Sequence, residues 1–500
     1  MNAAGIHDVE VAVIGYGPVG TVLTGLLAQR GVRVAAFERG ADVFTLPRAA
    51  HFDAEIARVF QQLGAMDAIL PATKATSGMD FVDAEDRVLM SFEAEDHEIA
   101  EGWPRSFMFY QPDVERALRS RVAELPSAQV HLEHEVLTID DRGDGVAVVV
   151  RDLCTGAERT VTAAYAVGCD GARSLVRAAM GATLEDLVFD QPWLVVDVML
   201  RGGAELPTRP TQYCTPARPA TFIPSAGDHR RWEFMLLPGE TAESMETPER
   251  IRDLIGPWID PDRVEVIRSA VYSFHALIAT GWRAGRLLLA GDAAHQMPPF
   301  LGQGMCAGIR DAANLEWKLT RVLRGSSDPA ILDTYETERA PHVRSFIETA
   351  VAAGRIIQTT DPEEAAMRDA FLLDRTNDRP PTPTVPPIGP GLGDPADPLR
   401  TERIPQPIDG SGTRRDDLLG DDVVLVVDPI AWSSLAPEDR ARAGRLPVVD
   451  AELTVPWLRA HGLVAAIVRP DRHVLASATT AAAVPAMVEG CVRELAGVGG

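Results

Sequence analysis

Three closely spaced glycines near the N-terminus constrain the fold of this chain more than any other feature. They lie in Gly15-Tyr16-Gly17-Pro18-Val19-Gly20, which follows an apolar, β-branched run at residues 8–14 and opens a helical pattern. A second such run at 32–37 completes a β-α-β unit, and Glu38 stands at its end. In such a unit the first glycine makes the tight turn, the second lets a pyrophosphate approach the helix N-terminus, and the third lets helix and strand pack closely. The segment predicts a dinucleotide-binding domain in which Glu38 accepts hydrogen bonds from a ribose.

Two further segments show the order strand, turn and helix, at residues 161–180 and 286–323. Between them, residues 185–280 alternate apolar and polar positions as antiparallel strands do, for example at 211–223 and 264–274. We therefore expect an α/β domain of Rossmann type that is interrupted by an inserted antiparallel sheet.

The C-terminal quarter has a different organisation. Residues 376–415 are rich in proline and glycine, which predicts a linker. Apolar runs and helical patterns return at 416–500 and predict a further folded domain. A chain of 500 residues is long enough for about three domains.

Charge and cysteine usage exclude several kinds of partner. The chain carries 48 Lys and Arg against 72 Asp and Glu, a formal net charge of −24. Binding to nucleic acid or to an anionic membrane favours a basic surface, so we expect neither partner. The five cysteines are widely spaced without a CxxC, which predicts neither a disulfide framework nor a metal site. With no charged-then-apolar leader and no long apolar run, we expect a cytoplasmic protein.

Two later motifs bear on which dinucleotide is bound, through their resemblance to a known family. Gly168-Cys169-Asp170-Gly171-Ala172-Arg173-Ser174 resembles the Asp-Gly motif of flavin-dependent aromatic hydroxylases. Gly291-Asp292-Ala293-Ala294-His295-Gln296-Met297-Pro298-Pro299 resembles their Gly-Asp motif. The order and spacing of all three motifs are similar to those of the single-component (group A) flavoprotein monooxygenases over residues 1–360. Three ordered motifs are far more specific than one.

The resemblance implies a fold like that of p-hydroxybenzoate hydroxylase. It places a discontinuous FAD-binding domain at 1–75, 100–180 and 283–375, and a substrate-binding domain at 76–99 and 181–282. After the linker, residues 416–500 resemble the thioredoxin-like domain of phenol hydroxylases. Without a CxxC that domain cannot perform dithiol chemistry, so we expect a structural role or a role in a homodimer.

The motifs also imply which residues hold the flavin. Asp292 accepts from ribitol hydroxyls, and the helix after Gly302-Gln303-Gly304 points its N-terminal partial charge at the flavin ring; a flexible loop is the alternative for that tripeptide. His295 is expected to support the Gly-Asp turn. The expected cofactor-binding residues are Gly15, Gly17, Pro18, Gly20, Glu38, Arg39, Arg48, Gln111, Asp170, Gly171, Arg173, Gly291, Asp292, Pro298, Gly302, Gln303, Gly304, Met305 and Cys306.

The activity implied by the resemblance is hydroxylation of a phenol. NADH or NADPH reduces FAD, reduced flavin and O2 form a C4a-hydroperoxide, and that species transfers a hydroxyl group to the ring. A base at the substrate hydroxyl favours the transfer, since a phenolate is the better nucleophile. The candidates for catalytic residues are His51, Asp53, Tyr213, Tyr272 and Pro298, and those for substrate binding are Arg218, Phe222, Phe234 and His275. A structural role is the alternative for His51, packing for the two tyrosines, and a surface role for Arg218.

The substrate is less constrained than the reaction. Residues 47–53, 231–236 and 302–308 are most similar to 3-(3-hydroxyphenyl)propionate hydroxylases, which implies a 3-hydroxyphenylpropionate-like acid. Such a carboxylate needs local cations, because the net charge of −24 repels it. A larger polyketide-type or a neutral phenolic aromatic is the alternative, and an acidic or apolar site favours the neutral phenol. A catalytically silent flavin-binding protein is the second alternative, against which the complete set of motifs argues.

Overall fold

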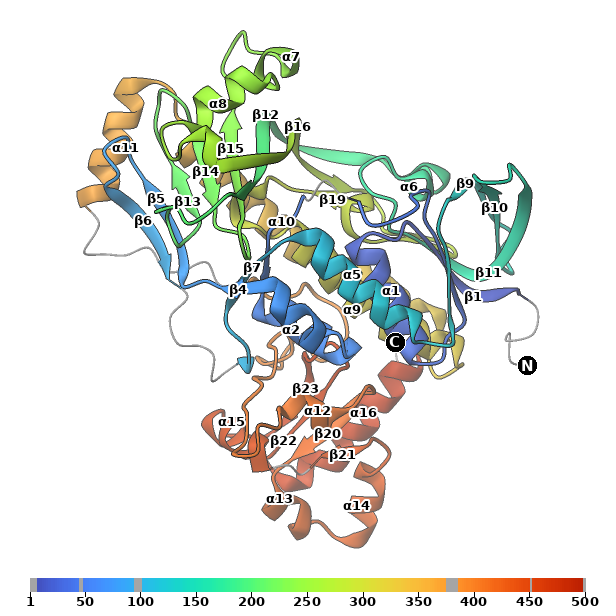
Figure 1. The fold of residues 1–500 in the computed structure, drawn as a ribbon. Helices are drawn as coiled ribbons and strands as arrows, with labels where there is room; N and C mark the ends of the chain where they lie inside the picture. The colour runs from blue at the N-terminus through green and yellow to red at the C-terminus, as the bar shows by residue number, and fades with distance from the viewer. Residues whose placement is uncertain (1–6, 45–47, 94–100, 375–384, 450–451, 498–500) are drawn as a thin grey trace.

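The computed structural model describes residues 7–44, 48–93, 101–374, 385–449 and 452–497. Residues 376–384 of the expected linker lie outside the described residues. In Figure 1, the sheet that contains β14 and β15 lies at the top, the sheet that contains β1 and β11 lies to the right, and the C-terminal region lies below α2.

The first sheet is built around the strand that precedes the glycine turn. β1 (Val9–Ile14) pairs in parallel with β2 (Val34–Phe37) and β11 (Glu158–Gly168). Every residue of β1 is buried, as expected of a central strand in a largely parallel sheet. The other strands of this sheet are β8 (Ala128–His131), β9 (His134–Asp141), β10 (Val146–Asp152), β17 (Arg283–Ala284) and β18 (Leu287–Leu289).

Helices from three parts of the chain pack together beside this sheet. α1 (Pro18–Gln29) starts directly after Gly17 and contacts α5 (Gln111–Ala123) and α9 (Gly304–Leu323). α9 in turn contacts α10 (Asp333–Ile357). A shorter helix, α6 (Leu175–Ala179), follows β11. The predicted strand–turn–helix units at 161–180 and 286–323 therefore form and join the same sheet.

The inserted sheet runs in the order β19-β16-β12-β15-β14-β13-β5-β6 and is antiparallel except where β13 meets β5. Its long strands are β12 (Leu184–Leu200) and β16 (Val264–Ala279). Residues 211–223, which alternate as antiparallel strands do, form two such strands, separated by a turn with Pro216 and Pro219. Proline cannot donate to the ladder. The remaining strands are β5 (Gly78–Val82), β6 (Val88–Glu93), β13 (Thr211–Tyr213), β14 (Ala220–Ile223), β15 (His229–Met235) and β19 (His295–Gln296). The short helices beside this sheet are α7 (Ala242–Met245) and α8 (Pro248–Ile255), and α11 (Pro362–Asp374) contacts β6.

A third, small sheet was not foreseen. β7 (Ser106–Phe109) lies between β3 (His51–Asp53) and β4 (Thr73–Ala75). β3 leads directly into α2 (Ala54–Leu63), and Asp53 caps that helix through a hydrogen bond from the Ile56 N–H (3.2 Å). A four-residue helix, α3 (Met66–Ile69), follows. This sheet fixes His51 and Asp53 between the two larger sheets.

The C-terminal region forms a mixed sheet with strand order β21-β20-β22-β23. Its strands are β20 (Val424–Val427), β21 (Val448–Val449), β22 (Ala465–Val468) and β23 (Val474–Ala478). Its helices are α12 (Arg415–Leu419), α13 (Pro429–Ser434), α14 (Pro437–Ala443), α15 (Val455–Ala460) and α16 (Val484–Ala496). Within the described ranges, no helix is long and apolar enough to cross a membrane. The same residues contain no group of three or more His, Cys, Asp or Glu side chains placed to hold a metal ion.

Candidate active site

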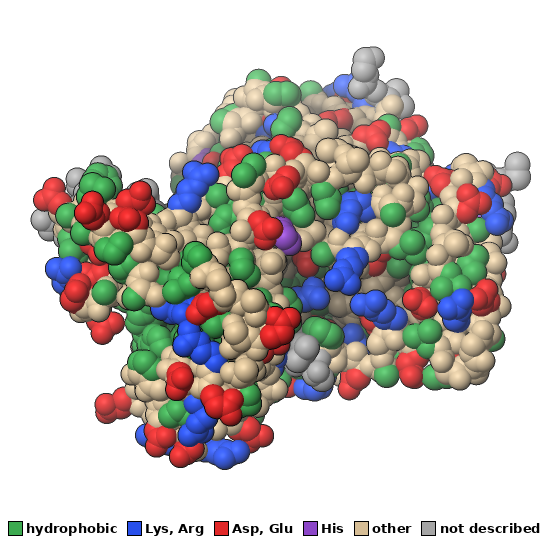
Figure 2. Space-filling view, turned by 90° about the horizontal axis from the view of Figure 1, so that it is seen from above, with side chains coloured by type: hydrophobic (Ala, Val, Ile, Leu, Met, Phe, Trp, Pro, Cys, Tyr) green, Lys and Arg blue, Asp and Glu red, His purple; other side chains and the backbone are tan. Residues whose placement is uncertain are grey.

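One large cavity lies between the first sheet, the inserted sheet and the small sheet. Its volume is about 1890 Å³, which exceeds the 300–1,000 Å³ typical of a site for one small molecule. Figure 2 shows the molecule from above, where the surface is hollowed near its centre and Lys or Arg side chains gather beside the hollow. The cavity has room for a dinucleotide and a second ligand.

The glycine turn at residues 15–20 forms one end of the cavity, which Gly15 and Gly17 line. Gly15 has a φ of +94°, and a Cβ there would lie 2.4 Å from the carbonyl oxygen of Cys169. A Cβ on Gly17 would meet no atom within 4 Å, so this position faces open space. Gly17 is also the N-cap of α1 and provides no side-chain cap, which leaves the first N–H groups of the helix for an anion. The turn therefore fits a pyrophosphate.

Three polar residues around this turn have hydrogen-bonding capacity that a dinucleotide can use. Glu38 accepts from the backbone N–H of Tyr16 (3.0 Å) and lines the cavity. Arg119, from α5, donates to the carbonyl of Tyr16 (2.9 Å), while its Nε and Nη1 are buried without a hydrogen-bond partner among the described residues. Asp170 Oδ2 accepts from Leu175 N (2.6 Å), and its Oδ1 is likewise buried and unpartnered within the described part of the chain. Burial raises the pKa of Asp170. Because unsatisfied buried polar atoms are costly, these atoms fit an anionic, hydroxyl-bearing ligand.

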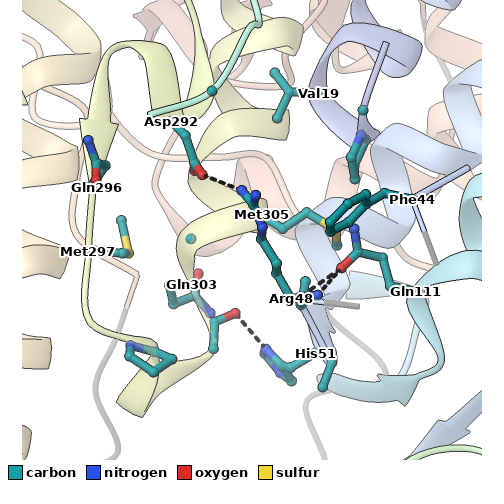
Figure 3. A pocket seen from close by; sticks show the side chains of 18 of the residues that line it. Val19, Phe44, Arg48, His51, Gln111, Asp292, Gln296, Met297, Gln303 and Met305 are labelled. Carbon is teal, nitrogen blue, oxygen red and sulfur yellow. Dashed lines mark hydrogen bonds and ion pairs between the residues drawn. The ribbon is translucent and has the colours of Figure 1, made fainter. Parts of the chain in front are cut away.

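An arginine and an aspartate face each other across the middle of the cavity (Figure 3). Arg48 Nη1 lies 3.7 Å from Asp292 Oδ2, and both side chains are about half exposed. Gln111 Oε1 accepts from the backbone N–H groups of Arg48 (2.7 Å) and Ala49 (2.8 Å), so Gln111 fixes the loop that carries the arginine. At 3.7 Å the two charged groups are too far apart for a direct hydrogen bond, so their polar atoms remain available to hydroxyl groups of a ligand beside them.

The Gly-Asp turn is held by a residue that the motifs did not indicate. Asp311, on α9, is fully buried and accepts from the backbone N–H of Gly291 (3.1 Å) and from His295 Nε2 (2.7 Å). Its other oxygen accepts from Arg339 Nε (2.9 Å). His295 therefore supports the turn, through Asp311.

The two base candidates in the small sheet have occupied polar atoms. His51 Nδ1 lies 3.3 Å from the carbonyl oxygen of Gly302, which can only accept, so Nε2 accepts from Ser106 Oγ (2.7 Å). Burial lowers the pKa of His51, which favours the neutral ring. Asp53 Oδ2 accepts from Arg310 (2.5 Å) and Gln303 (3.3 Å). Both side chains line the cavity, but their geometry orients the loop at 302–304 more than it offers a free base.

Charged residues of the inserted sheet form the opposite wall. Arg231 donates to Asp197 Oδ1 (2.7 Å) and to the carbonyl of Arg48 (2.8 Å). Glu233 is 5% exposed and has Arg231 Nη1 at 3.7 Å. Arg268 lies over the ring of Tyr272, 4.7 Å from its centroid. Arg231, Glu233 and Arg268 all line the cavity, and sequence reasoning missed these roles.

The structure brings most of the expected residues together. Those that line the cavity are Gly15, Gly17, Pro18, Glu38, Arg39, Arg48, His51, Asp53, Gln111, Asp170, Gly171, Arg173, Tyr272, His275, Asp292, Gly302, Gln303, Gly304 and Met305. Those that do not are Gly20, Tyr213, Arg218, Phe222, Phe234, Gly291, Pro298 and Cys306.

Four of the residues that do not line the cavity, Tyr213, Arg218, Phe222 and Phe234, belong to the inserted segment, and the structure shows where their side chains lie instead. Successive strand residues face opposite sides, and Phe222 and Phe234 pack on the side away from the cavity with Trp232. Tyr213 packs edge-on against Trp258, with ring centroids 5.3 Å apart. Arg218 is paired in bidentate fashion with Glu240, at 2.6 and 2.7 Å.

A cavity that offers an anion-binding helix terminus at one end and a polar sheet at the other is the arrangement of FAD-dependent monooxygenases that act on aromatic rings. The sequence agrees, since residues 8–350 match the family described as FAD binding domain, and the chain belongs to that family.

Named relatives narrow the class. The chain is 37% identical to a Rhodococcus jostii (strain RHA1) protein named probable NADH-specific resorcinol 4-hydroxylase, over 99% of this chain and 97% of the relative. It is 39% identical to a Mycobacterium sp. (strain JLS) protein named 3-(3-hydroxy-phenyl)propionate/3-hydroxycinnamic acid hydroxylase. That match covers 73% of this chain and 63% of the relative, so the matched region spans less than two thirds of the relative's length.

Solved structures support the fold. Aklavinone-11 hydroxylase in complex with FAD and aklavinone superposes with a TM-score of 0.80 and 25% identity, over 98% of this chain and 99% of that one. The rebeccamycin biosynthetic enzyme RebC with reduced flavin has the same TM-score at 23% identity, over 98% and 99% of the two chains, and so shows the fold alone. The expected fold class is confirmed. The chain is an FAD-dependent monooxygenase that uses a reduced nicotinamide to hydroxylate phenolic aromatic compounds.

Proposed function

We propose that the chain uses NADH and O2 to hydroxylate a small neutral phenol of the resorcinol class. The observation that carries the proposal is the carboxyl group of Glu233, buried in the cavity wall with no hydrogen bond from any described residue. The Rhodococcus relative, whose name includes NADH and resorcinol, supports it because the similarity extends over nearly the whole of both chains.

Glu233 is suited to accept a hydrogen bond from a phenol. Arg231 Nη1, at 3.7 Å, is too distant to donate to it, and the same guanidinium is held by Asp197 and by the carbonyl of Arg48. Burial raises the pKa of Glu233, although Arg231 opposes this. A phenolic O–H gives the carboxyl the partner it lacks, whereas a substrate carboxylate placed there is repelled.

The charge of the whole cavity also favours a neutral substrate over a carboxylate. Its lining includes eight arginines and eleven aspartates or glutamates. A bound dinucleotide adds further negative charge at the phosphates, so a neutral ring is the easier second ligand. Other polar groups of the same wall are Gln212 and Thr221, joined by a hydrogen bond of 2.6 Å.

The residues around the substrate would act by orientation and by excluding water. Bound FAD would supply the activation of O2, and one oxygen atom of that O2 is transferred to the ring. Tyr272, His275 and the loop at 302–304 line the same cavity as Glu233. His51, held between Ser106 and Gly302, fixes that loop. Closure of this space protects the reacting centre from water.

A 3-hydroxyphenylpropionate-like acid is the second candidate. Arg231 and Arg268 lie in the same wall and provide the local cations that a carboxylate needs. The names of the mycobacterial relatives favour this candidate.

The experiment compares resorcinol, 3-(3-hydroxyphenyl)propionate and a larger polyphenol as stimulants of NADH oxidation, with product identified by mass. We expect resorcinol to stimulate most. Glu233→Gln should raise the KM for resorcinol about tenfold or more, because a hydrogen bond to a charged group is worth roughly 1.5–3 kcal/mol. Glu185→Gln is the matched control, because Glu185 lies on β12 of the same sheet and forms a partly exposed ion pair with Arg344 of α10. If only 3-(3-hydroxyphenyl)propionate stimulates NADH oxidation, the resorcinol proposal is wrong and the second candidate holds. An unchanged KM for resorcinol in Glu233→Gln refutes the role of this carboxyl.

The individual roles of the cavity residues, the domain boundaries, a homodimer and a cytoplasmic location stay predictions. Light scattering of the FAD-bound protein measures its molar mass in solution. A mass of one chain contradicts the homodimer.

A further inference from the structure

The C-terminal region contributes a side chain to the cavity. Arg403 lines the cavity wall, although it lies beyond the residues that match the family. Its backbone is tied to the C-terminal sheet, because Ile404 N donates to Arg472 O (3.0 Å) and Val474 N donates to Glu402 O (2.9 Å). Arg403 is thus tied to the start of β23 by the bridge to His473, and its side chain pairs with Glu55 of α2. In Figure 1 the C-terminal region lies below α2.

Arg403 is one member of a continuous series of ion pairs. The series joins seven side chains of alternating charge, which are Asp416, Arg58, Glu101, Arg403, Glu55, Arg310 and Asp53. Its first member belongs to α12 of the C-terminal region, and its last lines the cavity and caps α2. Successive pairs are short: Arg58 to Asp416 is 2.8 Å, Arg403 to Glu101 is 3.0 Å, and Arg310 to Glu55 is 2.6 Å.

The charge balance at the start of α2 depends on Arg403. Asp53 and Glu55 both bind Arg310, so two carboxylates share one guanidinium. Arg403 pairs with Glu55 and supplies the second positive charge. Without it, Glu55 becomes a buried carboxylate with too little compensation, which draws Arg310 away from its other partners. Those partners are Asp53 (2.5 Å) and Gln303 (2.9 Å), and Gln303 is the residue before α9.

We propose that Arg403 is a positioning residue for the monooxygenase reaction, through which the C-terminal region completes the active site. It balances Glu55, so that Arg310 holds Asp53 and the Gln303 side chain at the cavity. The C-terminal region, which carries no redox motif, then has a function in catalysis: it keeps the loop at 302–304 in the position that couples NADH oxidation to hydroxylation.

The test uses the FAD-bound full-length protein and three variants: Arg403→Gln, Arg403→Lys and the double variant Glu55→Gln/Arg403→Gln. The readouts are product formed per NADH oxidised, hydrogen peroxide released, the Kd for FAD and the visible spectrum of the bound flavin. Resorcinol is the probe, and if the unmodified protein is not stimulated by it, the best stimulant of the panel replaces it. A failure of the substrate proposal is thereby visible in the unmodified protein alone. The matched control is Asp422→Asn, which removes an ion pair between the C-terminal region and α9 (Arg321, 3.3 Å) that does not line the cavity.

We expect Arg403→Gln to lower product per NADH at least about threefold and to raise peroxide correspondingly, because mutations along a side-chain network shift the balance between two arrangements of a distant site by factors of about this size. Its flavin spectrum should shift while FAD stays bound. Arg403→Lys should retain most of the coupling, and the double variant should recover coupling relative to Arg403→Gln because both charges are gone. Unchanged coupling in Arg403→Gln, an equal loss in Asp422→Asn, or no recovery in the double variant overturns the proposal. If Arg403→Gln does not fold, the double variant decides: normal coupling supports the proposal, and failure to fold contradicts it.

Discussion

Replacing Asp311 with asparagine tests the account of the flavin site most directly, because one carboxylate joins the Gly-Asp turn to two helices. Asp311 is fully buried and accepts from Gly291 N (3.1 Å), His295 Nε2 (2.7 Å) and Arg339 Nε (2.9 Å). Burial acts to raise the pKa of Asp311, but His295 and Arg339 outweigh it and lower the pKa. The carboxylate is therefore charged in the folded protein.

Asparagine keeps the shape of the side chain and removes the charge. The Arg339 guanidinium, 2% exposed, is then left buried without its counter-ion. Breaking a buried pair in this way costs about 3–5 kcal/mol, which is a large part of the roughly 5–15 kcal/mol that stabilises a typical folded protein. The amide N–H2 also faces a donor on one side, so the turn at Gly291 must shift, and we expect FAD affinity to fall about tenfold or more.

Two measurements check this expectation. Urea unfolding of the apoprotein, followed by circular dichroism, gives the free energy of unfolding, and fluorescence quenching during FAD titration gives the Kd. Asp113→Asn, in an exposed pair with Arg116 (2.8 Å), is the control and should change the free energy by less than about 1 kcal/mol. A loss below about 1 kcal/mol in Asp311→Asn, with FAD affinity unchanged, would refute the argued role.

Two further predictions follow from the packing of α9 and from the ion pairs that join Glu338 of α10 to α9 and to the C-terminal region. Gly308→Ala places a Cβ 2.5 Å from Val19 Cγ2 and 3.0 Å from Gly291 Cα, so α9 must move away from the turn. We expect a loss of FAD affinity of about tenfold in titration of the apoprotein, and equal affinity contradicts the packing argument. Burial acts to raise the pKa of Glu338, but Arg469 and Lys318 outweigh it and lower the pKa to about 2. Because this folded pKa lies below the usual 4.5, the stabilisation, about 3 kcal/mol, is present above 4.5 and is lost as the pH falls toward 2. Urea unfolding across that range measures it, and Glu338→Gln should flatten the dependence; a wild-type profile in that variant contradicts the assignment.

Turns that must leave space for a ligand could be predicted from the sequence. Gly15 is required by its positive φ, Gly17 leaves open space for a ligand at the helix N-terminus, and Asp170 and Asp292 follow strands at fixed places in their motifs. The role of each of these residues can be recognised from the few residues next to it in the sequence. The small sheet that holds His51 could not be predicted in this way, because its strands of three or four residues are too short to show a period.

Substrate-side residues could be predicted only if the facing of each strand was known. In β15, Arg231 and Glu233 face the cavity, while Trp232 and Phe234 pack in the core behind it. A choice based on aromatic character therefore selected the residue one position away, and a shift of one residue in a strand reverses the face.

The remaining contributions come from ion pairs between distant parts of the chain, for which no spacing rule exists. Glu55 and Arg403 are partners across more than three hundred positions, and each looks like an ordinary surface charge in the sequence. Only the fold brings them together. A guanidinium can bind two carboxylates at once, as Arg58, Arg310 and Arg403 each do. A lysine at one of these positions keeps the positive charge that balances the carboxylates, as expected for Arg403→Lys, but gives up part of the geometry that lets one side chain bind two of them.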